Sequence, residues 1–368
     1  MINFKKIIAC ITCAMVLLCA GCKENTSQPT GVVEPIEKLA LVTSNIELEL
    51  DFNYAAVWEG IQTYSTTINI NYGYYRPSEM TEEAITEQFE YAAVDGATVI
   101  MCMGDAFTPV VKNMQTKYPN VKFVVIDASA EELGTLEKNT HTIMFRQEQG
   151  GYLAGYATVK DGLKKLGFLG DHPGEAYTNY LYGFIQGAND AAKLTGESVE
   201  INVAYCSDYQ DDASAMGAVD TWYKNGTEVV MCCVDDIFTQ SLAQTAVSNM
   251  GYIIGTNNDQ SYLGANLDYN PFITSSMKGL REAVDATLEM MLAGAWEEEL
   301  GGRTLYFGLQ NGNYVYLPEY EATWLFDNFT LDEYGTLKNN IATGQILIDG
   351  AEMPAAELVT VNTLNTME

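Results

Sequence analysis

Short apolar runs rich in β-forming residues alternate with amphipathic stretches of helix length along most of the chain. We expect strands at 39–42, 98–102, 121–126, 165–169, 199–203, 229–233 and 252–254. We expect helices at 54–65, 81–95, 107–117, 148–161, 177–194, 211–225 and 238–249. Apolar strands separated by helices are typical of parallel sheets covered on both faces. The strands form two series, so the sequence predicts an α/β protein with two similar halves.

The net charge of the chain excludes some classes of binding partner. Its 368 residues include 49 acidic and 19 basic residues, a net charge of −30, and 47% are hydrophobic. That is enough apolar material to bury the cores of two domains. An acidic body repels phosphate, which argues against nucleic acid as a partner. It argues equally against adhesion to anionic lipid through basic side chains.

The N-terminus has the features of an exported chain. Lys5 and Lys6 precede an almost wholly apolar run at 7–20, which is shorter than the ~20 residues of a spanning helix but suits a signal-peptide core. Small residues then lead into Cys22, an arrangement that resembles a bacterial lipobox. We expect a signal peptide at 1–21, lipidation of Cys22 and a flexible tether at 22–37. Simple secretion with cleavage nearby is the alternative.

Cysteine spacing gives no metal site. Four cysteines mimic a zinc-ligand spacing but lie in the predicted export segment: Cys10, Cys13, Cys19 and Cys22. The other four are Cys102, Cys206, Cys232 and Cys233. Neighbouring residues on a strand point to opposite faces, so the last two cannot bind one ion together. Buried thiols are the favoured interpretation, and a disulfide among these four stays open.

Several predicted strand-to-helix turns carry acidic residues, namely Asp105, Asp127, Asp171, Asp235 and Asp236. Ligands of open α/β sheets bind outside the carboxyl ends of the strands, so these turns mark the expected site. Aspartate is also a common turn former and helix N-cap. A structural role explains each of these residues about as well as ligand contact does.

Enzyme chemistry has little support in the sequence. The chain has two histidines, His141 and His172, and neither lies near a serine or cysteine nucleophile motif. The glycines at 167–174 lack the Gly-Lys-Ser/Thr of a phosphate loop. We expect no catalytic activity, no cofactor and no metal.

The segment 145–157 (FRQEQGGYLAGYA) resembles the "YLAG" segment of BMP (basic membrane protein) substrate-binding lipoproteins. These serve ABC transporters, and the best-known members are purine nucleoside receptors. Further matches follow in order at 40–43, 52–53 with 58–60, 123–127, 166–170, 183–188 and 274–278. Their order and spacing make the set specific, although each match alone is weak.

The resemblance implies a type I periplasmic-binding-protein fold: two Rossmann-like α/β lobes, joined by three crossovers, with a ligand cleft between them. It implies crossovers near 142–145, 271–274 and 307–314. Lobe 1 would comprise 38–143 and 273–308. Lobe 2 would comprise 144–272 and 309–350, leaving 351–368 as a C-terminal tail.

The resemblance also implies ligand contacts at matching positions. Asn53 matches an asparagine that contacts ligand, but the following motif is shifted by one residue, so Tyr54 is the alternative. Asp127 matches an aspartate that contacts the base or sugar, and Lys278 a lysine that reaches sugar hydroxyls. Aromatic rings near helix starts would stack on a planar ligand, with Phe238 and Tyr54 as first candidates.

Two departures from the family pattern bear on the ligand. At 255–260 the family motif Gly-x-Asp-x-Asp-Gln has Asn257 in place of its first aspartate, while Asp259 matches the second. An amide offers one acceptor where a carboxylate can accept two bonds from a diol, which weakens the case for ribose. Asp235 and Asp236 replace a glycine-rich turn; they favour a ligand with donors or positive charge, or they simply cap the next helix.

These observations predict a lipid-anchored solute-binding protein on the extracytoplasmic face of a bacterial cell membrane. Its partners would be a small nucleoside-like ligand, the ABC permease, and the bilayer through Cys22. Two-lobe closure on a purine nucleoside is the first hypothesis. A sensing receptor of the same fold without transport, and a binder of riboflavin or a small cation, are the alternatives.

Overall fold

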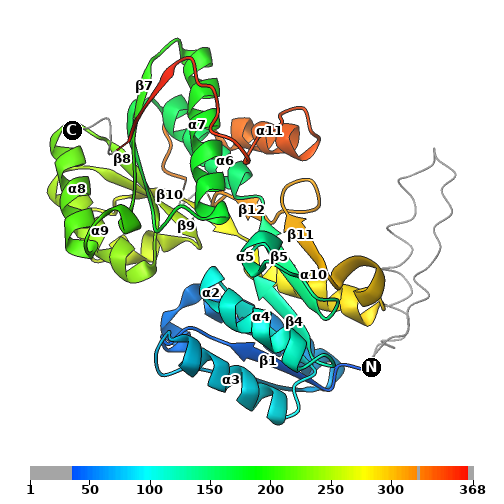
Figure 1. The fold of residues 1–368 in the computed structure, drawn as a ribbon. Helices are drawn as coiled ribbons and strands as arrows, with labels where there is room; N and C mark the ends of the chain where they lie inside the picture. The colour runs from blue at the N-terminus through cyan, green and yellow to red at the C-terminus, as the bar shows by residue number, and fades with distance from the viewer. Residues whose placement is uncertain (1–34, 321–323, 364–368) are drawn as a thin grey trace, which may run out of the picture.

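The computed structural model describes residues 35–320 and 324–363 of the chain. The predicted signal peptide, Cys22 and most of the predicted tether therefore lie outside the described residues. The described chain forms two lobes, one at each end of the view in Figure 1. Each lobe is a sheet with helices on both faces, the two-lobed α/β architecture that the sequence predicts.

Lobe 1 contains a six-stranded sheet in the order β11-β5-β4-β3-β1-β2. All of its strand pairs are parallel. Its strands are β1 (Lys38–Val42), β2 (Asn71–Tyr75), β3 (Val99–Met103), β4 (Lys122–Ile126), β5 (Thr140–Phe145) and β11 (Arg303–Phe307). Its helices are α2 (Phe52–Ile68), α3 (Glu82–Val94), α4 (Thr108–Lys117), α5 (Ala130–Leu133) and α10 (Leu280–Leu292).

Lobe 2 contains a seven-stranded sheet in the order β12-β10-β9-β8-β6-β7-β13. Its strands are β6 (Lys165–Gly170), β7 (Val199–Tyr205), β8 (Val229–Cys233), β9 (Tyr252–Asn257), β10 (Phe272–Lys278), β12 (Val315–Tyr316) and β13 (Val359–Thr363). The pairing of β12 with β10 is antiparallel, and the other pairs are parallel. Its helices are α6 (Gln147–Asp161), α7 (Glu175–Thr195), α8 (Asp212–Lys224), α9 (Asp236–Ser248) and α11 (Leu331–Ala342).

The two sheets repeat one strand order. In lobe 1 the first five strands lie as 2-1-3-4-5, and in lobe 2 the strands from β6 to β10 lie as 7-6-8-9-10. The order reverses between β1 and β3 and again between β6 and β8. Such reversal points are where open α/β sheets bind ligands, because the loops on either side diverge there. The fold therefore places two candidate half-sites, one on each lobe.

Burial explains why these runs form strands. In β8 all five residues are buried, and in β1 and β4 only the first residue is partly exposed. Helices cover both faces of each sheet, so these three strands lack the alternation of polar and apolar residues seen in half-exposed strands. The predicted strand at 229–233 has the observed bounds of β8, and most other predicted elements differ from the observed ones by one to three residues at an end.

Two predicted lobe boundaries differ from the structure. β10 pairs with β9 in lobe 2, so the chain passes into lobe 1 at Gly279 rather than at the predicted 271–274. β13 pairs with β7 along its whole length, so 359–363 belongs to the sheet of lobe 2 and is not a separate tail. Both strands are held by partners distant in sequence, which local patterns do not reveal.

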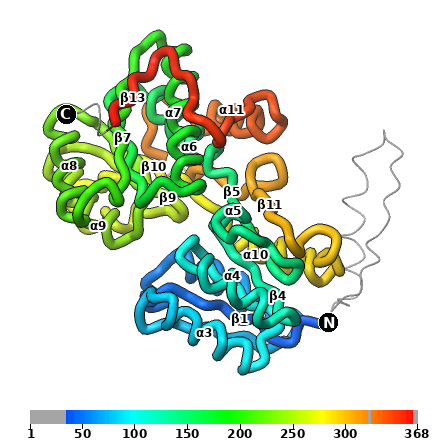
Figure 2. The backbone as a smooth tube through the Cα atoms, viewed as in Figure 1, coloured from blue at the N-terminus to red at the C-terminus, as the bar shows by residue number. Residues whose placement is uncertain are grey.

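Three segments connect the lobes side by side, as the tube in Figure 2 shows. The first follows β5, the second is Gly279 after β10, and the third lies at 308–314 between β11 and β12. Backbone hydrogen bonds join them: Arg146 N donates to Phe307 O (2.8 Å), and Gly279 N donates to Tyr314 O (2.8 Å). Adjacent connections with a few terminal residues are the usual form of a hinge.

Candidate functional site

A cleft lies between the lobes at the carboxyl ends of their strands. It encloses about 970 Å³ of empty space, including the part open to solvent. Its walls come from the loops after β3 and β4 in lobe 1 and after β6, β8 and β9 in lobe 2. The start of α2 and one face of α7 complete it. The cleft therefore lies at both strand-order reversals.

An ion pair crosses the cleft floor. Lys278 Nζ, at the end of β10 in lobe 2, lies 2.7 Å from Asp127 Oδ2, which follows β4 in lobe 1. The side chains are only 4% and 16% exposed. The ammonium also lies 5.7 Å from the ring centroids of Phe145 and Tyr180, and Gln147 Nε2 donates to Asp127 Oδ1 (3.2 Å). Both predicted residues line the cleft and join the two lobes.

Asn53, rather than Tyr54, faces the cleft at the start of α2. Asn53 lines the cleft, and its Oδ1 accepts from Asn258 Nδ2 of lobe 2 at 3.2 Å. Tyr54 is 4% exposed, and its hydroxyl donates to Met103 O at 2.6 Å. Burial raises the pKa of Tyr54 well above its ordinary value. Its role in this structure is to anchor α2 against β3.

Asn257 and Asp259 have different surroundings. Asn257 lines the cleft in the left-handed conformation (φ 69°), and its Oδ1 is buried without a hydrogen-bond partner among the described residues. Asp259 Oδ1 accepts from Ser261 N at 3.1 Å and caps the short helix Gln260–Gly264. Asp259 is not among the cleft-lining residues. The buried acceptor of Asn257 therefore has no donor among the described residues.

Asp235 caps α9 and also lines the cleft. Its Oδ1 accepts from Ile237 N (2.8 Å) and Phe238 N (2.9 Å), the geometry of a helix N-cap. Phe238 is 4% exposed and packs in the core of lobe 2 with Leu242 and Trp222. It does not line the cleft, so its placement does not support the predicted stacking role. The ring lies on the core-facing side of α9 because that side of the helix is apolar.

Tyr177 and Tyr180 provide the aromatic wall that the sequence reasoning missed. Both line the cleft from the first turns of α7, where a spacing of three residues puts them on one helix face. Tyr180 is 2% exposed. Their three-residue spacing near the start of the predicted helix at 177–194 was the sequence signal that could have identified them. They lie about one turn before the glycines of the 183–188 match.

A further interlobe contact involves His172, which sequence reasoning had considered only as a catalytic base. His172 Nε2 lies 2.7 Å from Asp105 Oδ2 of lobe 1, and His172 Nδ1 lies 3.0 Å from Asp171 Oδ2 of its own loop. The rings of Phe52 and Tyr262 also meet across the lobes, with centroids 4.4 Å apart. These contacts describe a closed arrangement of the lobes.

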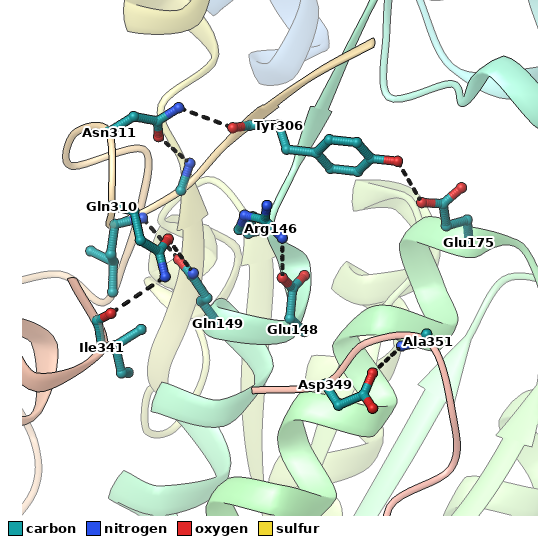
Figure 3. A network of polar contacts seen from close by, with 12 residues as sticks. Arg146, Glu148, Gln149, Glu175, Tyr306, Gln310, Asn311, Ile341, Asp349 and Ala351 are labelled. Carbon is teal, nitrogen blue, oxygen red and sulfur yellow. Dashed lines mark hydrogen bonds and ion pairs between the residues drawn. The ribbon is translucent and has the colours of Figure 1, made fainter. Parts of the chain in front are cut away.

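The hinge is fixed by a polar network (Figure 3). Gln149 Oε1 accepts from Leu309 N at 2.8 Å, and Gln149 Nε2 donates to Gln310 Oε1 at 2.6 Å. Arg146 Nη1 lies 3.3 Å from Glu148 Oε1, and its guanidinium covers the ring of Tyr306. Burial raises the pKa of the Glu148 carboxyl. The network therefore ties the first and third connections to the start of α6.

The four cysteines outside the predicted export segment, Cys102, Cys206, Cys232 and Cys233, are free thiols. The disulfide that the sequence left open is therefore absent among these four. In the described parts of the chain, 35–320 and 324–363, no helix is both long and apolar enough to cross a bilayer.

Comparisons with known proteins agree with this geometry. Residues 49–332 match the family described as "ABC transporter substrate-binding protein PnrA-like" (Bmp). Basic membrane protein A2 of Borrelia garinii subsp. bavariensis is 25% identical over 304 residues, 82% of this chain and 83% of that protein. Basic membrane protein B of Borreliella burgdorferi is 27% identical over 228 residues, 59% of this chain and 62% of that protein.

Solved structures share the fold. An ABC transporter solute-binding protein from Conexibacter woesei has a TM-score of 0.64 at 19% identity, covering 85% of this chain and 98% of its own. A transcriptional activator of the comK gene from Bacillus halodurans has a TM-score of 0.62 at 17% identity, covering 86% of this chain and all of its own. Together with the match over 49–332, the two-lobed fold and its cleft lead to one conclusion: the chain belongs to the PnrA-like (Bmp) family of ABC-transporter substrate-binding proteins.

Proposed function

We propose that this protein is a lipid-anchored solute receptor of an ABC importer. Its lobes close on an uncharged, ring-bearing solute, for which a purine nucleoside is the first candidate. The observation that carries the ligand class is the buried, unpartnered Oδ1 of Asn257 in a cleft whose charged groups already have partners among the described residues. A ligand there is recognised by hydrogen bonds and stacking rather than by its charge.

The acidic side chains of the cleft do not require a cationic ligand, because they have partners within the chain. Asp127 is paired with Lys278, and Asp105 and Asp171 flank His172. Two further carboxylates accept from backbone N–H groups: Asp235 caps α9, and Glu132 accepts from Ser129 N at 2.7 Å in a capping box. Each of these carboxylates therefore has a polar partner within the chain, which reduces its need for a cationic ligand.

The cleft supplies what a nucleoside needs. Tyr177, which is partly exposed, offers a ring for stacking on a purine, and Asn53 and Asn257 offer amides to its polar edges. Ligand contacts to both lobes stabilise the closed arrangement in proportion to the difference in affinity between closed and open forms. A micromolar dissociation constant corresponds to about −8 kcal/mol, within reach of stacking plus several buried hydrogen bonds.

The ligand class is tested by calorimetry on the purified chain with inosine, guanosine and adenosine, alongside riboflavin and the cation spermidine. We expect a nucleoside to bind with a micromolar or lower dissociation constant and to raise the melting temperature by several degrees. Binding of spermidine or riboflavin without any nucleoside would replace the proposed ligand by one of those alternatives.

A matched pair of variants locates the contact at Asn257. Asn257→Gly removes the amide and suits the positive φ of that position, so we expect at least tenfold weaker nucleoside binding with little loss of stability. Asn69→Gly is the control, because Asn69 is exposed, has a φ of 58° and lies at the end of α2 outside the cleft. Equal nucleoside affinity in the two variants would show that Asn257 does not contact the nucleoside.

The anchor rests on the residues at 18–22 and on the extracytoplasmic setting of this family. After loss of Lys5 and Lys6 the body has 17 basic and 49 acidic residues, a charge of −32. Basic side chains therefore cannot hold it to anionic lipid, whereas a covalent lipid on Cys22 would. We expect Cys22→Ser to abolish labelling by a palmitate analogue and to release the protein from the membrane fraction. Cys19→Ser, in the same segment, should leave both unchanged, and lipidation persisting in Cys22→Ser would contradict the assignment.

A sensing role is the second candidate, supported by relatives with regulatory names. Transcriptional activator protein med of Bacillus subtilis is 23% identical to 81% of this chain, and the comK activator of Bacillus halodurans shares the fold. Uptake of radiolabelled nucleoside by cells with and without this protein separates the roles. Transport requires uptake to fall when the protein is absent, whereas a pure sensor leaves uptake intact.

A further inference from the structure

His172 lies between two carboxylates that belong to different lobes. Asp105, in the turn after β3, faces Nε2 at 2.7 Å, and Asp171, in the loop after β6, faces Nδ1 at 3.0 Å. The three side chains are partly exposed, at 35% for His172, 35% for Asp105 and 48% for Asp171. Solvent protons therefore reach a group that spans the interlobe boundary.

The chemistry of imidazole makes this geometry proton-dependent. A neutral imidazole has one N–H group, so one of its two nitrogens would turn a lone pair toward a carboxylate. Both nitrogens donate only in the imidazolium form, and then both contacts are charge-assisted hydrogen bonds. The observed pair of distances is satisfied by a protonated His172.

The groups around His172 are acidic or neutral. Besides Asp105 and Asp171, the ring of Tyr177 from α7 lies 4.8 Å away edge-on, and burial keeps that phenol neutral by raising its pKa. Glu132 of α5 adds negative charge near Asp105, and Glu175 of α7 lies in turn near Glu132. The cation that lines the same cleft, Lys278, is engaged by Asp127. Burial alone would lower the pKa of His172, but the bond to Asp171 and the charge of Asp105 outweigh it and raise the pKa above its ordinary 6.5.

Other contacts also cross between the lobes. Lys278 pairs with Asp127, Asn258 Nδ2 donates to Asn53 Oδ1, and Phe52 packs on Tyr262. The Tyr306 hydroxyl donates to Glu175 Oε1 at 3.4 Å. Among these described contacts, the one made by His172 is the one that rests on an imidazole.

We propose that His172 is a positioning residue that latches the two lobes together by binding a proton between Asp105 and Asp171, so that solute capture is stronger in mildly acidic medium than in mildly alkaline medium. The proposal rests on the proposed function to the extent that the closed form is the solute-bound form. His172 acts through the lobe geometry and need not touch the solute.

The direction of the pH dependence follows from linkage. Opening moves Asp105 away from His172 and lowers the pKa of the imidazole, so the closed form binds the proton more tightly. The extra stability of the closed form is fully present below the pKa of the open form. It is lost as pH rises from there through the higher pKa of the closed form. A single proton limits the change in affinity to at most tenfold per pH unit in that interval.

The first experiment follows the histidine C2–H resonances by NMR between pH 5 and 9. The chain has two histidines, and burial lowers the pKa of His141 to about 4, so His141 is a non-titrating internal reference. We expect His172 to titrate above 6.5 and Asp105→Asn to bring its midpoint down by about one pH unit. Asp268→Asn, an exposed aspartate of lobe 2 outside the cleft, is the matched control. A midpoint at or below 6.5 that Asp105→Asn leaves unchanged would overturn the latch.

The second experiment measures closure and capture. Small-angle scattering of the unliganded chain should show a more compact form at pH 5.5 than at pH 8.5, and inosine affinity should weaken about fivefold over the same range. His172→Gln keeps one donor and one acceptor but cannot titrate, so both pH dependences should flatten. An unchanged pH dependence in His172→Gln refutes the latch even if inosine binds. Failure of inosine to bind at any pH refutes the proposed ligand, while the NMR and scattering results still decide the latch.

Discussion

Replacing Gly183 by alanine is expected to lower the free energy of unfolding by about 3 kcal/mol or more, among the largest effects of any single methyl group in this chain. A Cβ at Gly183 of α7 would lie 1.9 Å from the carbonyl oxygen of Glu148 and 2.6 Å from its carbonyl carbon, both in the backbone of α6. Real Cβ atoms do not approach backbone so closely, so the two helices must separate. Separation breaks a contact that is fully buried.

The clash recurs along the whole helix pair. A Cβ at Gly187 would meet Tyr152 O at 2.1 Å, and on the other helix a Cβ at Gly151 would meet Tyr180 O at 2.1 Å. Gly155 faces Phe184 O in the same way, at 2.2 Å. Glycines four residues apart on each helix form a flat strip that allows the backbones to touch. The "YLAG" segment and the 183–188 match are thus two halves of one helix contact rather than ligand-binding motifs.

Gly217→Ala in α8 is the matched control. It is also a glycine inside a helix of lobe 2, but apart from the backbone of its own helix no described atom lies within 4 Å of its Cβ position. We expect it to be neutral or to stabilise by up to about 1 kcal/mol, because alanine is the better helix former. Urea unfolding followed by circular dichroism measures both variants. Similar stabilities for Gly183→Ala and Gly217→Ala would show that α6 and α7 do not pack this closely.

Local patterns predicted β1, β3, β4, β6, β7, β8 and β9, most of which are nearly continuous apolar runs. They did not predict β2, whose sequence NYGYY is largely exposed. They also missed two internal strands, β5, which reads THTIMF and is buried throughout, and β10, which reads FITSSMK with polar residues in its centre. The polar residues of β10 are buried because α6 packs on it: Ser275 and Ser276 are 0% exposed. β13 was missed for a related reason, since only its pairing with β7 makes it a strand. Pairing between distant segments is information that a short window of sequence does not contain.

The cleft residues could be predicted where they follow strands. Asp127, Asn257 and Lys278 lie at the carboxyl ends of β4, β9 and β10, so the order of strands alone brings them to one edge. Their contact with a ligand remains a prediction. Tyr180 and the His172 latch depend on how α7 is rotated and how near the lobes approach, and neither follows from strand order. Phe238 was assigned to the cleft from its place near a helix start, but the apolar face of α9 turns it into the core.

Lys278→Met is the second variant with a large expected effect. It removes the ammonium that faces Asp127 Oδ2 at 2.7 Å but keeps most of the apolar volume between the rings of Phe145 and Tyr180. The carboxylate of Asp127 is then left mostly buried with Gln147 as its remaining side-chain donor. Loss of one partner of a buried ion pair costs about 3–5 kcal/mol, so we expect a fall in unfolding free energy at the lower end of that range. Inosine affinity should fall at least a hundredfold, because the pair also joins the two lobes.

The double variant Asp127→Asn with Lys278→Met separates stability from binding. Asparagine tolerates the positive φ of position 127 (55°) and needs no counter-charge, so the double variant should recover at least half of the lost stability. Its inosine affinity should stay as low as that of Lys278→Met, because a neutral pair gives the closed form no ionic bridge. Lys112→Met, an exposed lysine of α4, should change neither quantity. If the double variant instead regained inosine binding together with stability, Lys278 would serve only to neutralise Asp127, and the solute would be held without it.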